Sequence, residues 1–119
     1  MNVTKWTVAV VLIAVVAVGF ADRAVAGKKK VKGNDLYKEF CKPCHEEGSE
    51  NEEYTPMTLI QDQWERFFDE KYEATHSTVN DPNHGDKPVT EVITAEDLEK
   101  LKDWTIDHAA DSEQPMTCG

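Results

Sequence analysis

The apolar residues of this chain are concentrated in one short segment. Residues 6–20, WTVAVVLIAVVAVGF, form an unbroken apolar run and hold 11 of the 31 Ala, Val, Leu and Ile residues in the 119-residue sequence. A chain of this length allows one small domain, which excludes a multidomain enzyme. The rest of the chain must therefore fold with few aliphatic side chains, and small domains do so only with an additional source of stability.

The first 26 residues have the pattern of an export signal. A short basic start precedes the apolar run, and Ala24-Val25-Ala26 supplies the small residues of a cleavage site. Counting Ala21, the run ends after 16 residues at the charged pair Asp22-Arg23, whereas a spanning helix needs about 18 or more. An uncleaved anchor is the alternative, because positive charge is heavier after the run than before it. We expect 1–26 to be a signal peptide, 27–33 a basic tail and 34–119 a domain exported to the periplasm or cell envelope.

The exported part is strongly acidic. The whole chain has 13 basic and 23 acidic residues, of which residues 1–26 contain two basic residues and one acidic residue. Four lysines lie together in KKKVK at 28–32, so the body after Lys32 has 7 basic and 22 acidic residues, a net charge of −15. A field of this sign excludes nucleic acid and anionic lipid as probable ligands, and it favours partners with a basic surface.

The spacing of apolar residues predicts three helices and no strands. A first helix begins at Asn34 or Asp35 and loosens near Pro43, which has no amide hydrogen. A second runs from about 59 to 72, with Thr58 as its cap and one apolar side made of Ile60, Trp64, Phe67, Phe68 and Tyr72. A third follows the cap Thr94 and ends near Ala110.

Long polar segments separate these helices. Residues 46–55, EEGSENEEYT, indicate a solvated loop. Residues 73–93 contain a strong turn signal at 81–85, and a structureless loop of this length in a small domain is often functional. The fold class predicted is therefore all-α, with three helices on long loops.

One motif points to specific chemistry. Cys41-Lys42-Pro43-Cys44-His45 has the Cys-x-x-Cys-His pattern of covalent haem attachment. Two cysteines three apart lie about one helical turn from each other, so both thiols can reach the two vinyl groups on one porphyrin edge. The histidine that follows can then bind the iron from the proximal face. We expect haem c on Cys41 and Cys44, with His45 as the proximal ligand.

Other interpretations of the motif have less support. A thioredoxin-type redox pair needs a preceding strand, which the pattern does not predict. A zinc site needs a second Cys/His pair at regular spacing, and only Cys118 and scattered histidines remain. No nucleophile–base pair or carboxylate dyad is evident, so we do not expect an enzyme.

Beyond the motif, the chain resembles the class I c-type cytochromes. Gly33, Tyr37 and Cys41 match the first helix of that family, in which a small residue lets the last helix cross closely. Pro56 and Leu59 resemble the Pro and Leu on the proximal side, where the Pro carbonyl accepts a hydrogen bond from the proximal imidazole. Residues 94–108 resemble the final helix, with Leu98, Leu101 and Trp104 meeting the first. The resemblance implies a small cytochrome c-like fold wrapped around one haem.

The sequence departs from that family at the distal iron ligand. The family usually supplies a Met from the loop before the last helix, but residues 73–93 contain no Met. His84 is our first candidate, since its loop can fold back onto the ring; Met116 in the tail and His76 after the second helix are the alternatives. Met57 is the least favoured candidate.

The third cysteine, Cys118, is left over once haem takes the other two. It can pair with a second copy in a disulfide-linked dimer, or be a bystander on a frayed end. The function expected is a monohaem electron-transfer protein with a basic redox partner and no stable membrane insertion after cleavage. A haem-based sensor of small ligands and a small cytochrome subunit of a respiratory complex are the alternatives.

Overall fold

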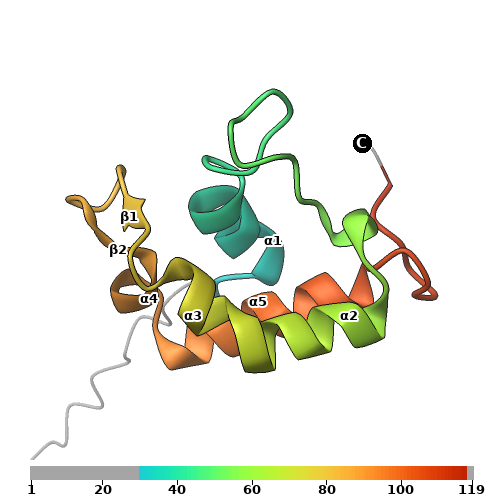
Figure 1. Cartoon of the computed structure of the whole chain (residues 1–119). Coiled ribbons are helices and arrows are strands. Elements are labelled where there is room, and N and C mark those ends of the chain that lie inside the picture. The colour runs from blue at the N-terminus through green and yellow to red at the C-terminus, as the bar shows by residue number, and fades with distance from the viewer. Residues whose placement is uncertain (1–29, 118–119) are drawn as a thin grey trace, which may run out of the picture.

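The computed structural model describes residues 30–117. About half of these residues are helical, and there is one two-stranded sheet among them (Figure 1). The three predicted helical regions are present, but the all-α class is only partly right because of the sheet. The signal peptide expected at 1–26 and Cys118 lie outside the described residues. In the part described, no helix combines the length and apolarity needed to cross a membrane.

The first helical segment is α1 (Gly33–Leu36), which continues as the π-helical turn η1 (Tyr37–Cys41). Its cap is the extended residue Lys32, and no side chain caps it, so the caps expected at Asn34 or Asp35 are wrong. The helix begins earlier because Gly33 is already packed against α5 (Ala95–Asp107). A Cβ atom on Gly33 would lie 2.1 Å from Cβ of Trp104 and 2.8 Å from the carbonyl oxygen of Lys100. The close crossing that the resemblance implied is thus present.

The second helical segment is continuous from α2 (Gln61–Arg66) through the π-helical turn η3 (Phe67–Lys71) to α3 (Tyr72–His76). Its cap is Ile60, whose amide donates to Oε1 of Gln63 at 3.2 Å. Thr58 instead belongs to the short 3-10 helix η2 (Pro56–Thr58) and accepts from the Thr55 amide at 2.9 Å. Ile60 is 42 % exposed, so the apolar side of this segment begins only at Trp64.

Residues 73–93 are more ordered than the predicted loop. After α3, the strands β1 (Asn80–Asp81) and β2 (Lys87–Pro88) pair antiparallel, with Asn80 opposite Pro88. Gly85 and Asp86 turn the chain with φ of 75° and 54°, the left-handed region that Gly adopts readily. The short helix α4 (Val89–Val92) then leads to α5. The turn signal was correct, but the two-residue strands are too short for an alternating pattern.

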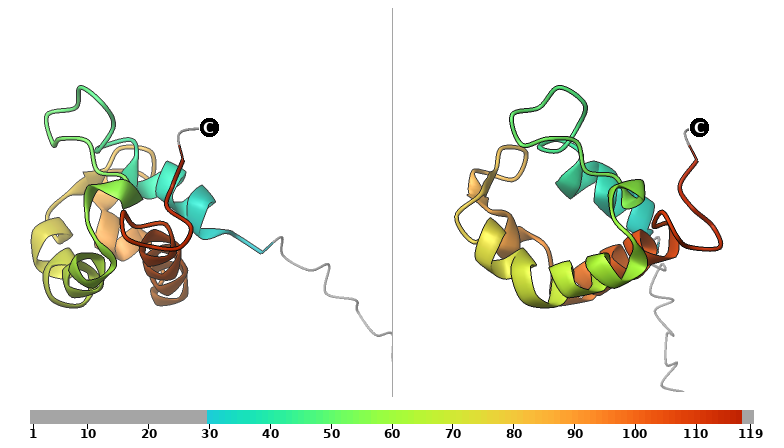
Figure 2. Two further views of the ribbon diagram at one scale, coloured as in Figure 1. Left: turned by 90° about the vertical axis from the view of Figure 1, so that its right-hand side faces the viewer. Right: turned by 45° about the vertical axis from the view of Figure 1, so that its right-hand side comes forward.

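The last helix, α5, confirms its predicted cap, because Thr94 Oγ1 accepts from the Asp97 amide at 3.1 Å. It runs alongside α2 and crosses α1 (Figures 1 and 2). One core cluster joins Leu36 and Tyr37 to Leu101, with Trp104 packed against it. A second cluster joins Tyr72 to Val89 and Ile93, and both Leu98 and Phe40 of the first helical segment pack against it.

Candidate functional site

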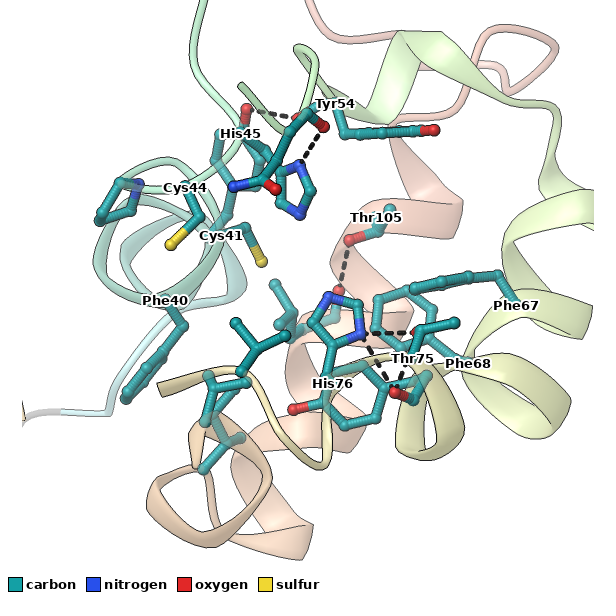
Figure 3. A pocket seen from close by; sticks show the side chains of 18 of the residues that line it. Phe40, Cys41, Cys44, His45, Tyr54, Phe67, Phe68, Thr75, His76 and Thr105 are labelled. Atoms are coloured by element: carbon teal, nitrogen blue, oxygen red, sulfur yellow. Dashed lines mark hydrogen bonds between the residues drawn. The ribbon is translucent and has the colours of Figure 1, made fainter. Parts of the chain in front are cut away.

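A large cavity lies between the first helical segment, the second segment and the hairpin. Its volume is about 520 Å³, within the range of roughly 300–1,000 Å³ that is usual for cofactor sites. All three chemical residues of the motif line it (Figure 3). Its wall is mainly aromatic and aliphatic, and the aromatic members are Tyr37, Phe40, Tyr54, Trp64, Phe67, Phe68 and Tyr72.

The motif begins with the last residue of η1, and its other residues form a tight turn. Cys41 is the last residue of η1, and the amides of Cys44 and His45 both donate to its carbonyl oxygen, at 3.2 and 3.0 Å. This turn places both thiols and the imidazole on the cavity side of the chain, as Figure 3 shows. Cys41 and Cys44 are both partly buried, and no disulfide joins them.

The His45 ring is oriented by the acidic loop that follows it. Its Nδ1 lies 3.1 Å from the carbonyl oxygen of Asn51 and 3.2 Å from that of Glu52. Because a carbonyl oxygen only accepts, Nδ1 is a donor, which in the neutral ring leaves the lone pair on Nε2, directed into the cavity (Figure 3). Metal-binding histidines typically donate their other nitrogen in this way.

The resemblance implied a different partner for His45, the carbonyl of Pro56. That expectation is wrong: the Pro56 carbonyl accepts from the indole Nε1 of Trp64 at 2.8 Å. Pro56 is fully buried, and Leu59 lines the cavity beside it. Pro56 therefore anchors the second helical segment to the cavity wall, and the loop carbonyls take over the contact with the imidazole.

A second imidazole faces His45 across the cavity. The ring centroids of His45 and His76 are 6.2 Å apart, with an angle of 60° between the planes. Nδ1 of His76 lies 3.0 Å from the Tyr72 carbonyl oxygen, and 2.8 Å from Thr75 Oγ1. The carbonyl fixes the proton on Nδ1, so Nε2 is again the free nitrogen and points toward His45 (Figure 3).

Burial disfavours the charged forms of His76 and Cys41. Desolvation lowers the pKa of His76, more than its bond to Tyr72 raises it, and the nearby His45 lowers it further. Neutral imidazole is the form that binds a metal ion. Burial also raises the pKa of the Cys41 thiol to about 12, with a smaller contribution from Cys44.

The structure does not bring His84, our first candidate for the distal ligand, to the cavity wall. Its ring is occupied on both nitrogens: Nδ1 lies 2.8 Å from Asp81 Oδ2, and Nε2 lies 2.9 Å from Glu39 Oε1. Met116 lies in a separate groove beside Trp104, its amide donating to the His108 carbonyl at 3.0 Å. Of the candidates ranked from the sequence, His76 alone lines the cavity.

The pattern that identifies His76 is present in the sequence. Trp64, Phe68 and Tyr72 recur every four residues along the second helical segment, and the next position in this row is His76. The helix predicted from the sequence ends at about Tyr72, so His76 lies outside the row, in the loop that follows. The helix in fact continues through α3, so the row carries the imidazole into the cavity.

The wall of the cavity fits a porphyrin with covalent links at one edge. Apolar rings surround the space, and two thiols and two opposed imidazoles point into it. Two imidazoles that bind one metal ion from opposite sides, at about 2 Å each, have ring centroids roughly 6 Å apart. The Tyr72 hydroxyl is buried in the same wall without a hydrogen-bond partner, and Lys71 is the one lysine or arginine among the residues lining the cavity.

Within residues 30–117, no three His, Cys, Asp or Glu side chains are grouped so that they could hold a metal ion on their own. Comparisons with known protein families, with curated proteins and with solved structures found no match to this chain.

Proposed function

We propose that this chain is an exported monohaem c-type cytochrome that transfers electrons. Haem c is attached through Cys41 and Cys44, and its iron is held by His45 and His76. The observation that carries the proposal is the meeting of two thiols and two opposed imidazoles, each with Nε2 free, in one apolar cavity. His76 replaces His84 in this assignment.

Each residue has a defined task in this function. When bound, haem supplies an iron that accepts and gives up one electron reversibly. His45 and His76 are held in the metal-binding tautomer by backbone carbonyls, so neither ring has to turn when the charge at the metal changes. The aromatic wall excludes water, and Cys41 and Cys44 anchor one edge of the ring.

The ligand pair also supports a function without a substrate. A haem sensor needs an open or weakly held position opposite the proximal ligand, whereas in this proposal His76, whose ring centroid is 6.2 Å from that of His45, would hold the iron on that side. Two imidazoles favour the ferric state more than an imidazole and a thioether do, so a low reduction potential is expected. The net charge of −15 on the body favours a redox partner with a basic surface and association that slows as salt rises.

The experiment is to express the full chain in a host that matures c-type cytochromes and to isolate the exported protein. We expect a haem that stays on the chain in denaturing gels and adds the mass of one haem. The Cys41→Ser/Cys44→Ser double variant should lose this covalent link, whereas the control Cys118→Ser should keep it. A wild-type chain that is exported and folded but carries no haem would contradict the proposal.

A further inference from the structure

The charged cluster around His84 joins two parts of the cavity wall. Glu39 lies in η1, next to the residues that carry the thiols, and Asp81 lies in β1 of the hairpin. His84 contacts both carboxylates, and its ring stacks on Phe40 with centroids 5.1 Å apart. The hairpin is thus fastened to the first helical segment through one imidazole.

The geometry points to a positively charged His84. Both ring nitrogens face carboxylate oxygens, at 2.8 and 2.9 Å, and a carboxylate only accepts, so both nitrogens must donate. Asp81 is 5 % exposed and lines the apolar cavity, and a carboxylate in such a position needs a charged or hydrogen-bonded partner. The Asn83 amide supplies one bond to it, and His84 supplies the other.

The hairpin is connected to His76 by a short, hydrogen-bonded turn. The Val79 amide donates to the His76 carbonyl at 3.0 Å, and the Val89 amide donates to the Val79 carbonyl at 2.8 Å. Only three residues separate His76 from the start of β1. Motion of the hairpin away from the first helical segment therefore acts directly on the end of the helix that carries the second imidazole.

We propose that His84 is a positioning residue, which in its protonated form clamps the hairpin to η1 and thereby holds His76 in the cavity. The proposal rests on the proposed function, because it assigns His76 as an iron ligand. When His84 loses its proton, one nitrogen becomes an acceptor facing a carboxylate, and the clamp opens on the Glu39 side. The ligand His76 is then released more often.

The pH dependence has a definite sign. The bonds to Asp81 and Glu39 raise the pKa of His84 above its ordinary value of 6.5, and these two carboxylates, from the hairpin and from η1, are the charged groups that face the ring. The clamp is fully formed below 6.5, and it is lost as the pH rises through the higher pKa of the folded protein. Release of His76 should increase over the same range.

The test is the rate at which carbon monoxide binds to the reduced holoprotein, between about pH 5.5 and pH 9, since binding requires the second imidazole to leave. We expect the wild-type rate to rise on the order of threefold across this range. His84→Ala should bind fast at every pH, and Glu39→Gln should move the rise to lower pH. The matched control His108→Ala changes a histidine outside the cavity and should keep the wild-type profile.

A His84→Ala profile that matches the wild type overturns the proposal. If that variant does not fold, a Glu39→Gln profile identical to the wild type has the same consequence. Ring-proton NMR of His84 separates the two proposals, because it measures the pKa of the His84 ring directly and does not depend on a bound haem. If the wild-type chain is exported and folded without haem, and its His84 titrates above 6.5 and lower in Glu39→Gln, the proposed function is refuted but the clamp stands.

Discussion

The imidazole rings of His45 and His76 lie 6.2 Å apart, centre to centre, although 31 positions separate them in the sequence. A different element orients each ring: the acidic loop holds His45, and the helical turn of Tyr72 holds His76. The pair is therefore set by packing of the two helical segments around the cavity, not by one local motif.

This relationship predicts the effect of changing His76. His76→Ala should convert the ferric holoprotein from low spin to high spin, because one strong ligand is removed. His76→Met should raise the reduction potential, since a thioether favours the ferrous state. Optical spectra and a redox titration measure both effects. His84→Met is the matched control for the potential and His84→Ala for the spin state, and a low-spin His76→Ala together with a high-spin His84→Ala would restore His84 as the ligand.

The crossing of α1 and α5 predicts a second, structural effect. Gly33→Ala places a methyl group 2.1 Å from Trp104 Cβ and 2.8 Å from a backbone oxygen, so the helices must separate. We expect a loss of about 1–3 kcal/mol in the free energy of unfolding, the usual cost of overpacking. Urea unfolding measures it. Asp35→Ala, at an exposed position of the same helix, should cost much less.

The cap of α5 allows a matched pair of substitutions. Thr94→Ala removes the acceptor for the Asp97 amide and should cost about 1 kcal/mol of unfolding free energy. Thr94→Ser keeps the hydroxyl and should retain most of the stability. Equal stability of the two variants in thermal or urea unfolding would show that this hydrogen bond contributes nothing.

The raised pKa of Cys41 predicts slow alkylation in the haem-free protein. With its pKa near 12, the partly buried thiol carries little thiolate at pH 8 to 9, and the thiolate is the reactive form. In Cys44→Ser, iodoacetamide should label folded Cys41 slowly, and the rate should keep rising up to about pH 10. Unfolding in urea should accelerate the reaction at pH 8.5. Peptide mass spectrometry follows the label, and equal folded and unfolded rates would count against the burial.

Several features could be predicted because they depend on residues close in sequence. The three helical regions, the Thr94 cap and the turn at 81–85 all follow from local spacing or local hydrogen bonds. The small residue at 33 was also informative, because only a glycine allows the close crossing that the structure has. The apolar row along the second helical segment was recognised, but its last member was not.

The other features depend on distant contacts. Ile60 has the chemistry of a core residue, yet nothing packs over it and it remains exposed. The Pro56 carbonyl was expected to accept a hydrogen bond from His45, but it accepts one from the Trp64 indole instead. His84 matched the expected spacing for a ligand, but two carboxylates, one of them 45 positions away, hold its ring outside the cavity.

The sequence by itself determined the chemistry available to this protein: two thiols and an imidazole in one turn, an acidic body, and too few aliphatic residues for an ordinary core. Local spacing is enough for this, because a motif within one helical turn does not depend on the rest of the fold. Only the tertiary structure decided which second imidazole meets the first. The choice of His76 depends on how far the second helical segment continues, and on the two carboxylates that hold His84 away from the cavity. Both depend on contacts between segments far apart in the chain.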